Sequence, residues 1–310
     1  MILLTGASGF IGGAVLQALK ECAISVRPIY RKNVDHSDSV IIETLDKNTD
    51  WTHALNNVDV VIHCAARTHI MNDEAIDSMK EYYKINVDGS LQLARQAAEA
   101  GVRRFIFISS IKVNGESTKI GQKYSASDLP APEDAYGISK AEAEKKLFEL
   151  AQKTKMELVI IRPVMVYGPN VKGNFQTMMQ WIARGIPLPL GSAIKNRRSL
   201  VALDNLVNLI CICINHPQAV NQVFLISDDE DLSTAAILRR LGRAVGRDVR
   251  LLPVPVFLLN FGARLIGKSR IANRLLGSLQ VDIKKTRNLL GWTPPLTTDE
   301  GFKKLTRHKS

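Results

Sequence analysis

The glycine-rich segment at residues 5–12, TGASGFIG, constrains the fold more than any other feature of this sequence. A short apolar run precedes it, and a stretch with helical periodicity, Phe10–Glu21, follows it. Gly6 permits a tight turn, Gly9 lets a pyrophosphate approach the backbone, and Gly12 lets the helix and the strand pack closely. The helix N-terminus would then face the phosphates of a dinucleotide. One glycine triplet is a weak signal on its own, so the rest of the chain has to support it.

The first half of the chain alternates short apolar segments with helical ones, as a parallel α/β sheet requires. We expect strands at 2–4, 25–30, 41–45, 59–64, 104–108, 157–161 and 222–226, and long helices at 76–100 and 135–154. Short apolar strands separated by helices predict a parallel sheet that is covered on both faces. The expected fold is therefore α/β, with a Rossmann-type doubly wound parallel sheet.

The amino-acid composition changes after residue 162, which indicates a second, smaller unit. Prolines and glycines crowd residues 163–191. We expect a dinucleotide-binding domain at 1–169, to which the chain returns at about 193–227. Residues 170–192 and 228–310 would then form a smaller C-terminal substrate-binding lobe.

Composition and charge exclude several classes of function. No apolar run reaches the ~18 residues that a membrane span needs, so we expect no span. The first strand begins at Ile2, so we expect no signal peptide and a cytoplasmic protein. The net charge of +11 raises the possibility of nucleic acid, but the basic residues are scattered and an anionic nucleotide explains them equally well. The four Cys and six His residues show no metal-ligand spacing, so we expect no metal.

The end of the second expected strand bears on the choice of cofactor. An NAD site usually places Asp or Glu there, whereas an Arg accommodates the extra phosphate of NADP. This chain has Arg31 and Lys32 after Tyr30 and no acid, which favours NADP(H) and leaves NAD(H) possible. Asp46 could reach the adenine amino group, and Ala65 would leave room for a ribose, although both could be ordinary loop residues.

A Tyr and a Lys four residues apart, Tyr136 and Lys140, lie at the start of an expected helix. Four residues is about one helical turn, so both side chains point the same way. A neighbouring ammonium can lower the pKa of a Tyr from its usual value of ~10, which makes it a usable proton donor and acceptor. Ser110 ends the fifth expected strand, and ligands bind at the carboxyl ends of such strands. The spacing arises by chance in many helices and a Ser often caps one, but the agreement of the motifs favours a catalytic set.

Two later segments could contact a substrate. Residues 162–169, RPVMVYGP, follow the sixth expected strand and could press Pro163 against one face of a nicotinamide. Arg197 or Arg198 could form a bidentate pair with a diphosphate, although a solvated basic turn is the plain alternative.

These motifs occur in the order found in the extended short-chain dehydrogenase/reductase family, which the chain resembles over nearly its full length. The resemblance rests on the glycine segment, the Ser and YxxxK set, RPxxVYGP and the closing GWTP at 291–294. The chain is similar to its NAD-dependent epimerase/dehydratase members, the UDP-glucose 4-epimerase branch. Residues 109–116 and 171–175 resemble a subgroup that contains UDP-N-acetylquinovosamine dehydrogenases, the C4-keto reductases of O-antigen and lipopolysaccharide biosynthesis.

The resemblance implies a role for each matching residue. Ser110 would position the substrate, Tyr136 would be the acid and base, and Lys140 would hold the nicotinamide ribose and lower the pKa of Tyr136. The residues expected to bind the cofactor are Gly6, Gly9, Phe10, Ile11, Gly12, Arg31, Asp46, Ala65, Tyr136, Lys140 and Pro163. The residues expected to bind the substrate are Ser110, Tyr136, Asn174 and Arg197.

Two departures from typical 4-epimerases decide between the alternatives. The acid after the second strand is missing, and Leu279 or Ser278 stands where epimerases often place an aromatic side chain, which suggests room for an N-acetyl group. We therefore expect an NAD(P)-dependent reductase that acts on C4 of a UDP-4-keto-6-deoxy-N-acetylhexosamine. The alternative is a UDP-glucose or UDP-N-acetylglucosamine 4-epimerase with bound NAD. A non-catalytic dinucleotide sensor is disfavoured because Tyr136 and Lys140 are both present, and the family implies a homodimer.

Overall fold

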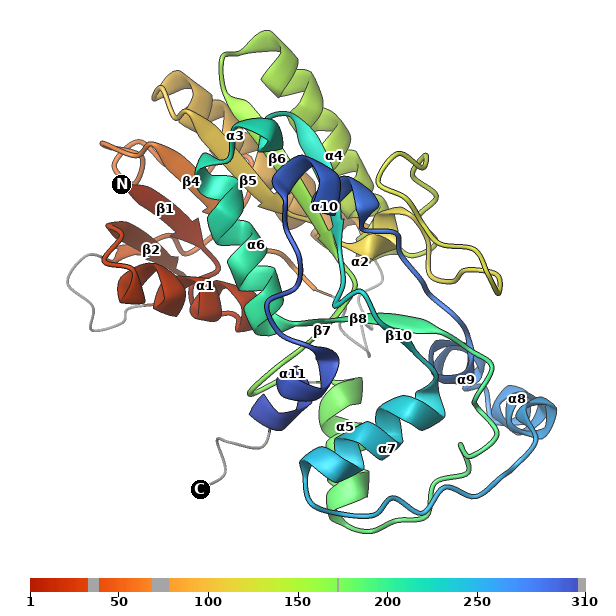
Figure 1. The fold of residues 1–310 in the computed structure, drawn as a ribbon. Helices are drawn as coiled ribbons and strands as arrows, with labels where there is room; N and C mark the ends of the chain where they lie inside the picture. Colours follow the sequence, from red (N-terminus) through yellow and green to blue (C-terminus); the bar gives the residue numbers. More distant parts are fainter. Residues whose placement is uncertain (33–38, 69–77, 172, 306–310) are drawn as a thin grey trace.

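The computed structural model describes residues 1–32, 39–68, 78–171 and 173–305, and it contains one large and one small sheet (Figure 1). The strands of the large sheet are β1 (Ile2–Thr5), β2 (Val26–Tyr30), β3 (Val40–Ile41), β4 (Val60–His63), β5 (Arg104–Ile108), β6 (Glu157–Pro163) and β9 (Gln222–Ile226). They are all parallel, in the order β3-β2-β1-β4-β5-β6-β9. The order reverses beside β1, which confirms the expected doubly wound sheet.

Helices cover both faces of this sheet (Figure 1). They are α1 (Phe10–Glu21), α2 (Ser78–Tyr82), α3 (Ser90–Glu99), α4 (Ala135–Lys153) and α6 (Leu203–Asn215). Along β5, Ile106 and Ile108 pack into the core under α1 and α6, while Phe105 and Phe107 pack into the core under α3 and α4. This alternation is the period of two that every strand imposes on its side chains.

The expected helix at 76–100 is a helix with a wide turn in its middle. Its described part runs as α2, a π-helical segment at Tyr83–Gly89, and α3. The buried Asn86 in the wide turn binds the backbone N–H and C=O of Arg67 at 2.8 and 3.1 Å, and the hydroxyl of Ser139 at 2.9 Å. These bonds compensate for the irregular backbone, since π-helical turns otherwise occur only rarely.

The expected strand at 41–45 is wrong in its length, because β3 covers only Val40–Ile41. The hydroxyl of Thr49 donates to the carbonyl oxygen of Thr44 and accepts from the backbone N–H of Asp46, both at 3.0 Å. The chain therefore turns away from the sheet where the apolar pattern suggested that it continues.

The small sheet contains β7 (Met165–Tyr167), β8 (Arg198–Ala202) and β10 (Asp231–Leu232). β8 is parallel to β7 and antiparallel to β10. Of the segment at about 193–227, which we expected to return to the large sheet, residues 198–202 join the small sheet and residues 222–226 join the large one. The other helices of this lobe are α5 (Asn174–Ala183), α7 (Thr234–Ala244), α8 (Val256–Leu265), α9 (Ser269–Leu276) and α11 (Thr298–Lys304). Helix α10 (Lys284–Leu290) packs against β9 of the large sheet instead (Figure 1). The division into domains remains a prediction.

The aromatic rings of Tyr167, Phe175 and Phe302 pack together beneath the small sheet, with ring centroids 4.8 to 6.1 Å apart. This separate core holds the C-terminal helix α11 against β7 and α5.

Within the described ranges, no helix is long and apolar enough to cross a membrane. The same ranges hold no cluster of three His, Cys, Asp or Glu side chains that could bind a metal.

Candidate active site

The glycine segment forms a turn that other residues would obstruct. Gly6 has φ of +71°, and a Cβ atom there would lie 2.8 Å from the backbone nitrogen of Ala65. A Cβ atom on Gly12 would lie 2.1 Å from the carbonyl oxygen of Gly6, so α1 packs directly on the end of β1. Gly9 is the N-cap of α1 and offers no side-chain cap, which leaves backbone N–H groups of the first helical turn for an anion.

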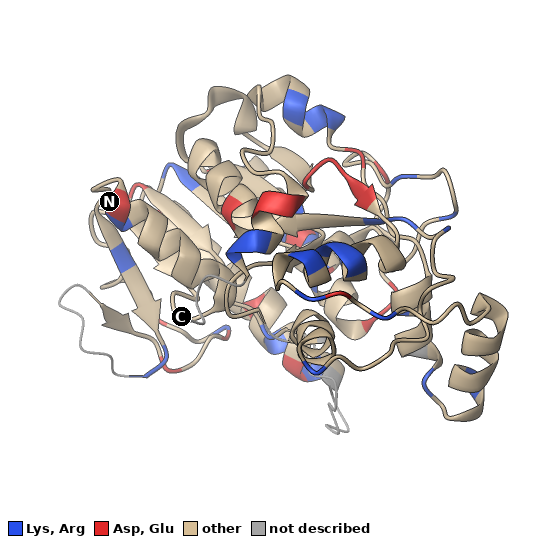
Figure 2. Cartoon of the chain, turned by 60° about the horizontal axis from the view of Figure 1, so that its bottom comes forward, with Lys and Arg blue, Asp and Glu red and all other residues tan. Residues whose placement is uncertain are grey.

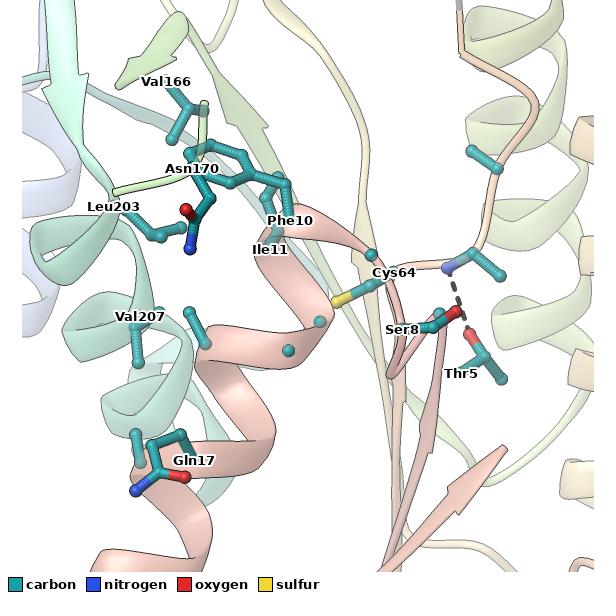
Figure 3. Close-up of a pocket in the computed structure, with 18 of the residues that line it drawn as sticks. Thr5, Ser8, Phe10, Ile11, Gln17, Cys64, Val166, Asn170, Leu203 and Val207 are labelled. Carbon is teal, nitrogen blue, oxygen red and sulfur yellow. Dashed lines mark hydrogen bonds between the residues drawn. The ribbon is translucent and has the colours of Figure 1, made fainter. Parts of the chain in front are cut away.

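A cavity of about 1450 Å³ lies in front of this turn, between α1 and α6 (Figure 3). Figure 3 shows Phe10 and Val166 near one end of it, and Gln17 and Val207 further along the two helices. Seven of the residues expected to bind the cofactor line this cavity, namely Gly6, Gly9, Phe10, Ile11, Gly12, Arg31 and Ala65. Its size, its small residues and its free helix N-terminus fit an extended dinucleotide.

The other expected cofactor residues lie elsewhere. Asp46 is outside the described lining of the large cavity and binds the backbone N–H of Asn48 at 2.9 Å, so it stabilises its own turn. Pro163 lines a second, smaller cavity. Lys32, which the argument for NADP also used, is exposed and lies outside the described lining of both cavities.

A buried chain of hydrogen bonds supports the wall of the large cavity. The ring of His63 contacts the hydroxyls of Thr5 at 2.7 Å and Ser90 at 2.8 Å. The Thr5 hydroxyl accepts a bond from the backbone N–H of Ala65 at 3.2 Å, drawn as a dashed line in Figure 3. Burial, with a smaller contribution from the charge of Lys140, lowers the pKa of His63 to about 3, so the ring is neutral. The sequence analysis did not identify His63 as part of the site.

Lys140 is buried beneath the ends of β4 and β5. Its Nζ donates to the carbonyl oxygen of Ile108 at 2.8 Å and lies 4.3 Å from the centroid of the Phe107 ring. Burial lowers the pKa of Lys140 to about 8, and the charge of Glu144 opposes this shift. The charge of Lys140 also acts on Cys64, which lines the large cavity, so the ammonium lies close to the cavity wall.

Tyr136 is positioned by the cap of α4, because Asp134 accepts a bond from the backbone N–H of Gly137 at 2.7 Å. Burial raises the pKa of Tyr136, the charge of Asp134 adds to this, and a hydrogen bond with Ser110 opposes it. The expectation that Lys140 lowers this pKa is wrong for the structure as it stands. The Lys140 ammonium is bound to the Ile108 carbonyl and is not among the groups that shift the phenol.

Ser110 caps a turn and also lines a cavity, so both of the roles considered for it fit its position. Its side chain caps the short 3-10 turn Ile111–Val113 by accepting from the backbone N–H of Lys112 at 3.2 Å. Ser110 also lines the smaller cavity. Ser110 contacts Tyr136, and Lys140 lies beside Cys64 in the wall of the large cavity, so the three residues expected to be catalytic stand between the two cavities.

Glu144 and Arg162 form a buried ion pair next to these residues. The pair spans 2.5 Å, and Glu144 also accepts a bond from the hydroxyl of Ser109 at 2.5 Å. Arg162 donates to the side-chain oxygen of Asn114 at 2.9 Å. The network ties the ends of β5 and β6 to α4. Glu144 was missed, although its position four residues after Lys140 places both on one helix face.

The smaller cavity has a volume of about 270 Å³, and its wall includes two arginines, Arg198 and Arg274, and the ion pair of Lys112 with Glu116. Burial and the charge of Arg274 lower the pKa of Arg198. The Nε atom of Arg198 is buried and has no hydrogen-bond partner among the described residues. Two nearby guanidinium groups, one with a buried donor to spare, suit an anionic ligand with several oxygens.

Of the two arginines considered for a diphosphate, the structure favours the second. Arg197 is exposed and donates to the carbonyl oxygens of Ile194 and Asn196. It also lies outside the described lining of the smaller cavity. Its neighbour Arg198 starts β8 and points to the opposite side, as strand geometry requires. Arg274 was missed by the sequence analysis. Asn174 begins α5, and its side chain lies outside what the structure describes.

The comparison with known proteins agrees with this geometry. The family described as the NAD dependent epimerase/dehydratase family matches residues 2–227. A curated relative from Vibrio cholerae, described as UDP-glucose 4-epimerase, is 49% identical over 305 residues, which cover 97% of this chain and 93% of the relative.

Two solved structures are similar in fold. UDP-N-acetylglucosamine 4-epimerase from Bacillus cereus has a TM-score of 0.81 at 18% identity, covering 98% of this chain and 97% of that one. UDP-glucose 4-epimerase from Thermotoga maritima with UDP-glucose has a TM-score of 0.77 at 22% identity, covering 98% and 96%. The resemblance drawn from the sequence is confirmed, and this chain is an enzyme of the NAD dependent epimerase/dehydratase family.

Proposed function

We propose that this enzyme is a nucleotide-sugar 4-epimerase that retains NAD and inverts the C4 hydroxyl of a UDP-hexose. The observation that carries the proposal is the 49% identity, over nearly the whole chain, to a relative described as UDP-glucose 4-epimerase. The comparisons thus favour the alternative raised by the sequence over the expected reductase. The site supports it, because the Ser110, Tyr136 and Lys140 set lies between a dinucleotide-sized cavity and a cavity with two arginines.

In this proposal the large cavity holds the cofactor. The N-terminus of α1 would bind the pyrophosphate, and Ala65 would lie near a ribose. Lys140 would bind the nicotinamide ribose with the N–H donors of its ammonium that the carbonyl of Ile108 does not use. A bound NAD would supply the hydride chemistry at C4 of the sugar, accepting a hydride and giving it back.

The protein's own part is proton transfer and positioning. Tyr136 would take the proton of the C4 hydroxyl and return it to the C4 oxygen once the opposite face of C4 has been reduced. Ser110 would hold the C4 oxygen near the phenol, since its hydroxyl already contacts Tyr136. The raised pKa of Tyr136 makes it an acid without ligands, so its action as a base requires a nearby positive charge in the loaded site.

The smaller cavity would hold the UDP-sugar. Arg198 and Arg274 would bind the diphosphate from two sides. Leu279 lines the same cavity, whereas Ser278 binds the backbone N–H of Arg197 at 3.0 Å. A Leu where a larger aromatic ring could stand leaves room for a C2 N-acetyl group, so both plain and N-acetylated hexoses are candidate substrates.

The second candidate is a C4-keto reductase that consumes NADPH. It is favoured by one observation. Arg31 lines the large cavity at the end of β2, and the described residues that follow this strand directly, Arg31 and Lys32, are both basic. The comparisons give no support to a preference for NADP. A role in O-antigen synthesis and a homodimer remain predictions.

The test is turnover without added cofactor. The purified enzyme would be incubated with UDP-galactose, and separately with UDP-N-acetylgalactosamine, and the products separated by chromatography. We expect conversion to the gluco epimer and an absorbance spectrum that shows retained NAD. Failure to convert either sugar, together with NADPH consumption on a UDP-4-keto sugar, would establish the reductase instead.

A further inference from the structure

Helix α8 is apolar and lies on the surface of the C-terminal lobe, where an apolar helix is unexpected. None of its residues is buried. Phe257 is 69% exposed, Phe261 61% and Leu265 72%, and Ile266 just beyond the helix is 67% exposed. Large exposed apolar patches on a protein surface mark contact sites for another protein or a membrane.

The exposed side chains form one continuous face. Phe257, Phe261 and Leu265 follow one another at intervals of four residues, so they lie along one side of α8. Leu258 extends this side by one residue. In Figure 1, α8 and α9 lie at the edge of the lobe, away from the large sheet. We call these residues, with Leu252 before α8 and Ile271 on α9, the α8 surface.

The charges around the α8 surface are almost all positive. Residues 243–276 contain seven Lys and Arg residues and one acidic residue, Asp248. Arg250, Arg264 and Lys268 are exposed beside the apolar side chains. In Figure 2 the helix at the right-hand edge of the molecule carries basic but no acidic positions.

We propose that the α8 surface docks on an anionic lipid bilayer and lies in the plane of the headgroups. A helix with a large exposed apolar side and neighbouring cations is the pattern of interfacial membrane binding. Anionic headgroups attract the basic residues, while the phenylalanine rings enter the boundary of the acyl chains. A second copy of the chain fits less well as the occupant, because it would bring two clusters of like charge together.

The docking surface adjoins the smaller cavity but does not overlap its described lining. Helix α9 carries Ile271 on the α8 surface and Arg274 in the cavity wall. Phe257 and Phe261 lie outside the described lining of both cavities. The inference goes beyond the proposed function, and neither depends on the other.

The experiment is co-sedimentation of the full chain with lipid vesicles. We expect the protein to pellet with vesicles of phosphatidylcholine and phosphatidylglycerol in equal amounts, to pellet much less with pure phosphatidylcholine, and to be released at high salt. The double variant Phe257→Ser with Phe261→Ser should weaken partitioning by about tenfold or more, since two large apolar side chains are lost. The variant Arg264→Gln with Lys268→Gln should weaken binding to the anionic vesicles only.

A matched control is Ile120→Ser with Leu129→Ser, which removes two apolar side chains that are 75% and 87% exposed elsewhere. It should bind vesicles as the unchanged protein does. All variants should keep the turnover of soluble UDP-sugar, which shows that they are folded and separates this test from that of the proposed function. Absence of sedimentation with anionic vesicles would overturn the proposal. So would self-association, seen by light scattering, that the Phe257 and Phe261 variant abolishes while vesicle binding is unchanged.

Discussion

The two cavities of this enzyme are built in opposite ways. At the end of β1, the wall of the large cavity is formed mostly by glycines and other residues that are close together in the sequence, between Thr5 and Ala14. The smaller cavity is walled by side chains from distant segments, among them Ser110, Met165, Arg198 and Arg274. The turn that would receive a pyrophosphate is local, although α6 and residues 166–171 complete its cavity, whereas the smaller cavity is assembled entirely from short segments that are far apart in the sequence.

Tyr136→Phe removes the proposed proton carrier between the two cavities and should have the largest effect. Loss of a general acid and base reduces kcat by about 10²- to 10⁴-fold. Retained NAD and UDP affinity should be nearly unchanged, because the phenol lies outside the described lining of both cavities. Steady-state kinetics and calorimetry check this. Ile138→Ala, at an exposed position in the same helical turn, should leave kcat intact.

Arg198→Gln should affect only the smaller cavity. Loss of a buried charged contact to a diphosphate costs about 2–5 kcal/mol, which corresponds to roughly 30-fold or more in affinity for UDP. The NAD content should not change. Arg197→Gln is the matched control, because the exposed Arg197 binds only backbone carbonyls of its own turn. Equal losses from both variants would show that the smaller cavity is not the diphosphate site.

Gly12→Ala should affect only the large cavity. The new Cβ atom would lie 2.1 Å from the carbonyl oxygen of Gly6, so α1 must move away from β1. Overpacking of this kind costs about 1–3 kcal/mol of unfolding free energy, and we expect loss of retained NAD as well. Gly13→Ala meets its nearest atom at 3.4 Å and should behave almost normally. Retained NAD in Gly12→Ala would contradict the placement of the pyrophosphate.

Lowering the pH should destabilise the folded protein through His63, which supports the wall of the large cavity. Because burial lowers its pKa to about 3, the folded protein excludes the proton that the unfolded chain binds below its pKa of about 6.5. The free energy of unfolding should therefore fall by about 2 kcal/mol from pH 6.5 to 5 and continue to fall towards pH 3. Urea titrations at several pH values measure this. His63→Gln should flatten the dependence, whereas His53→Gln, at an exposed position, should preserve it.

The contrast between the cavities also explains what the sequence could predict. Helix α1 and strands β5 and β9 begin and end where the patterns placed them, because their signals are local. Strand β3 is shorter than expected because the side chain of Thr49 ends it from eight residues away. Arg274 could not have been found, since nothing in its own helix indicates that it faces Arg198, 76 residues earlier.

The direct test of the proposed reaction follows the hydride. UDP-galactose carrying deuterium at C4 would be converted by the enzyme in the presence of added unlabelled NADPH, and the product examined by mass spectrometry. An epimerase that retains its cofactor returns the same hydride, so we predict UDP-glucose with the deuterium still at C4 and no consumption of NADPH. Loss of the label from C4, or its replacement by hydrogen as NADPH is consumed, would contradict the account.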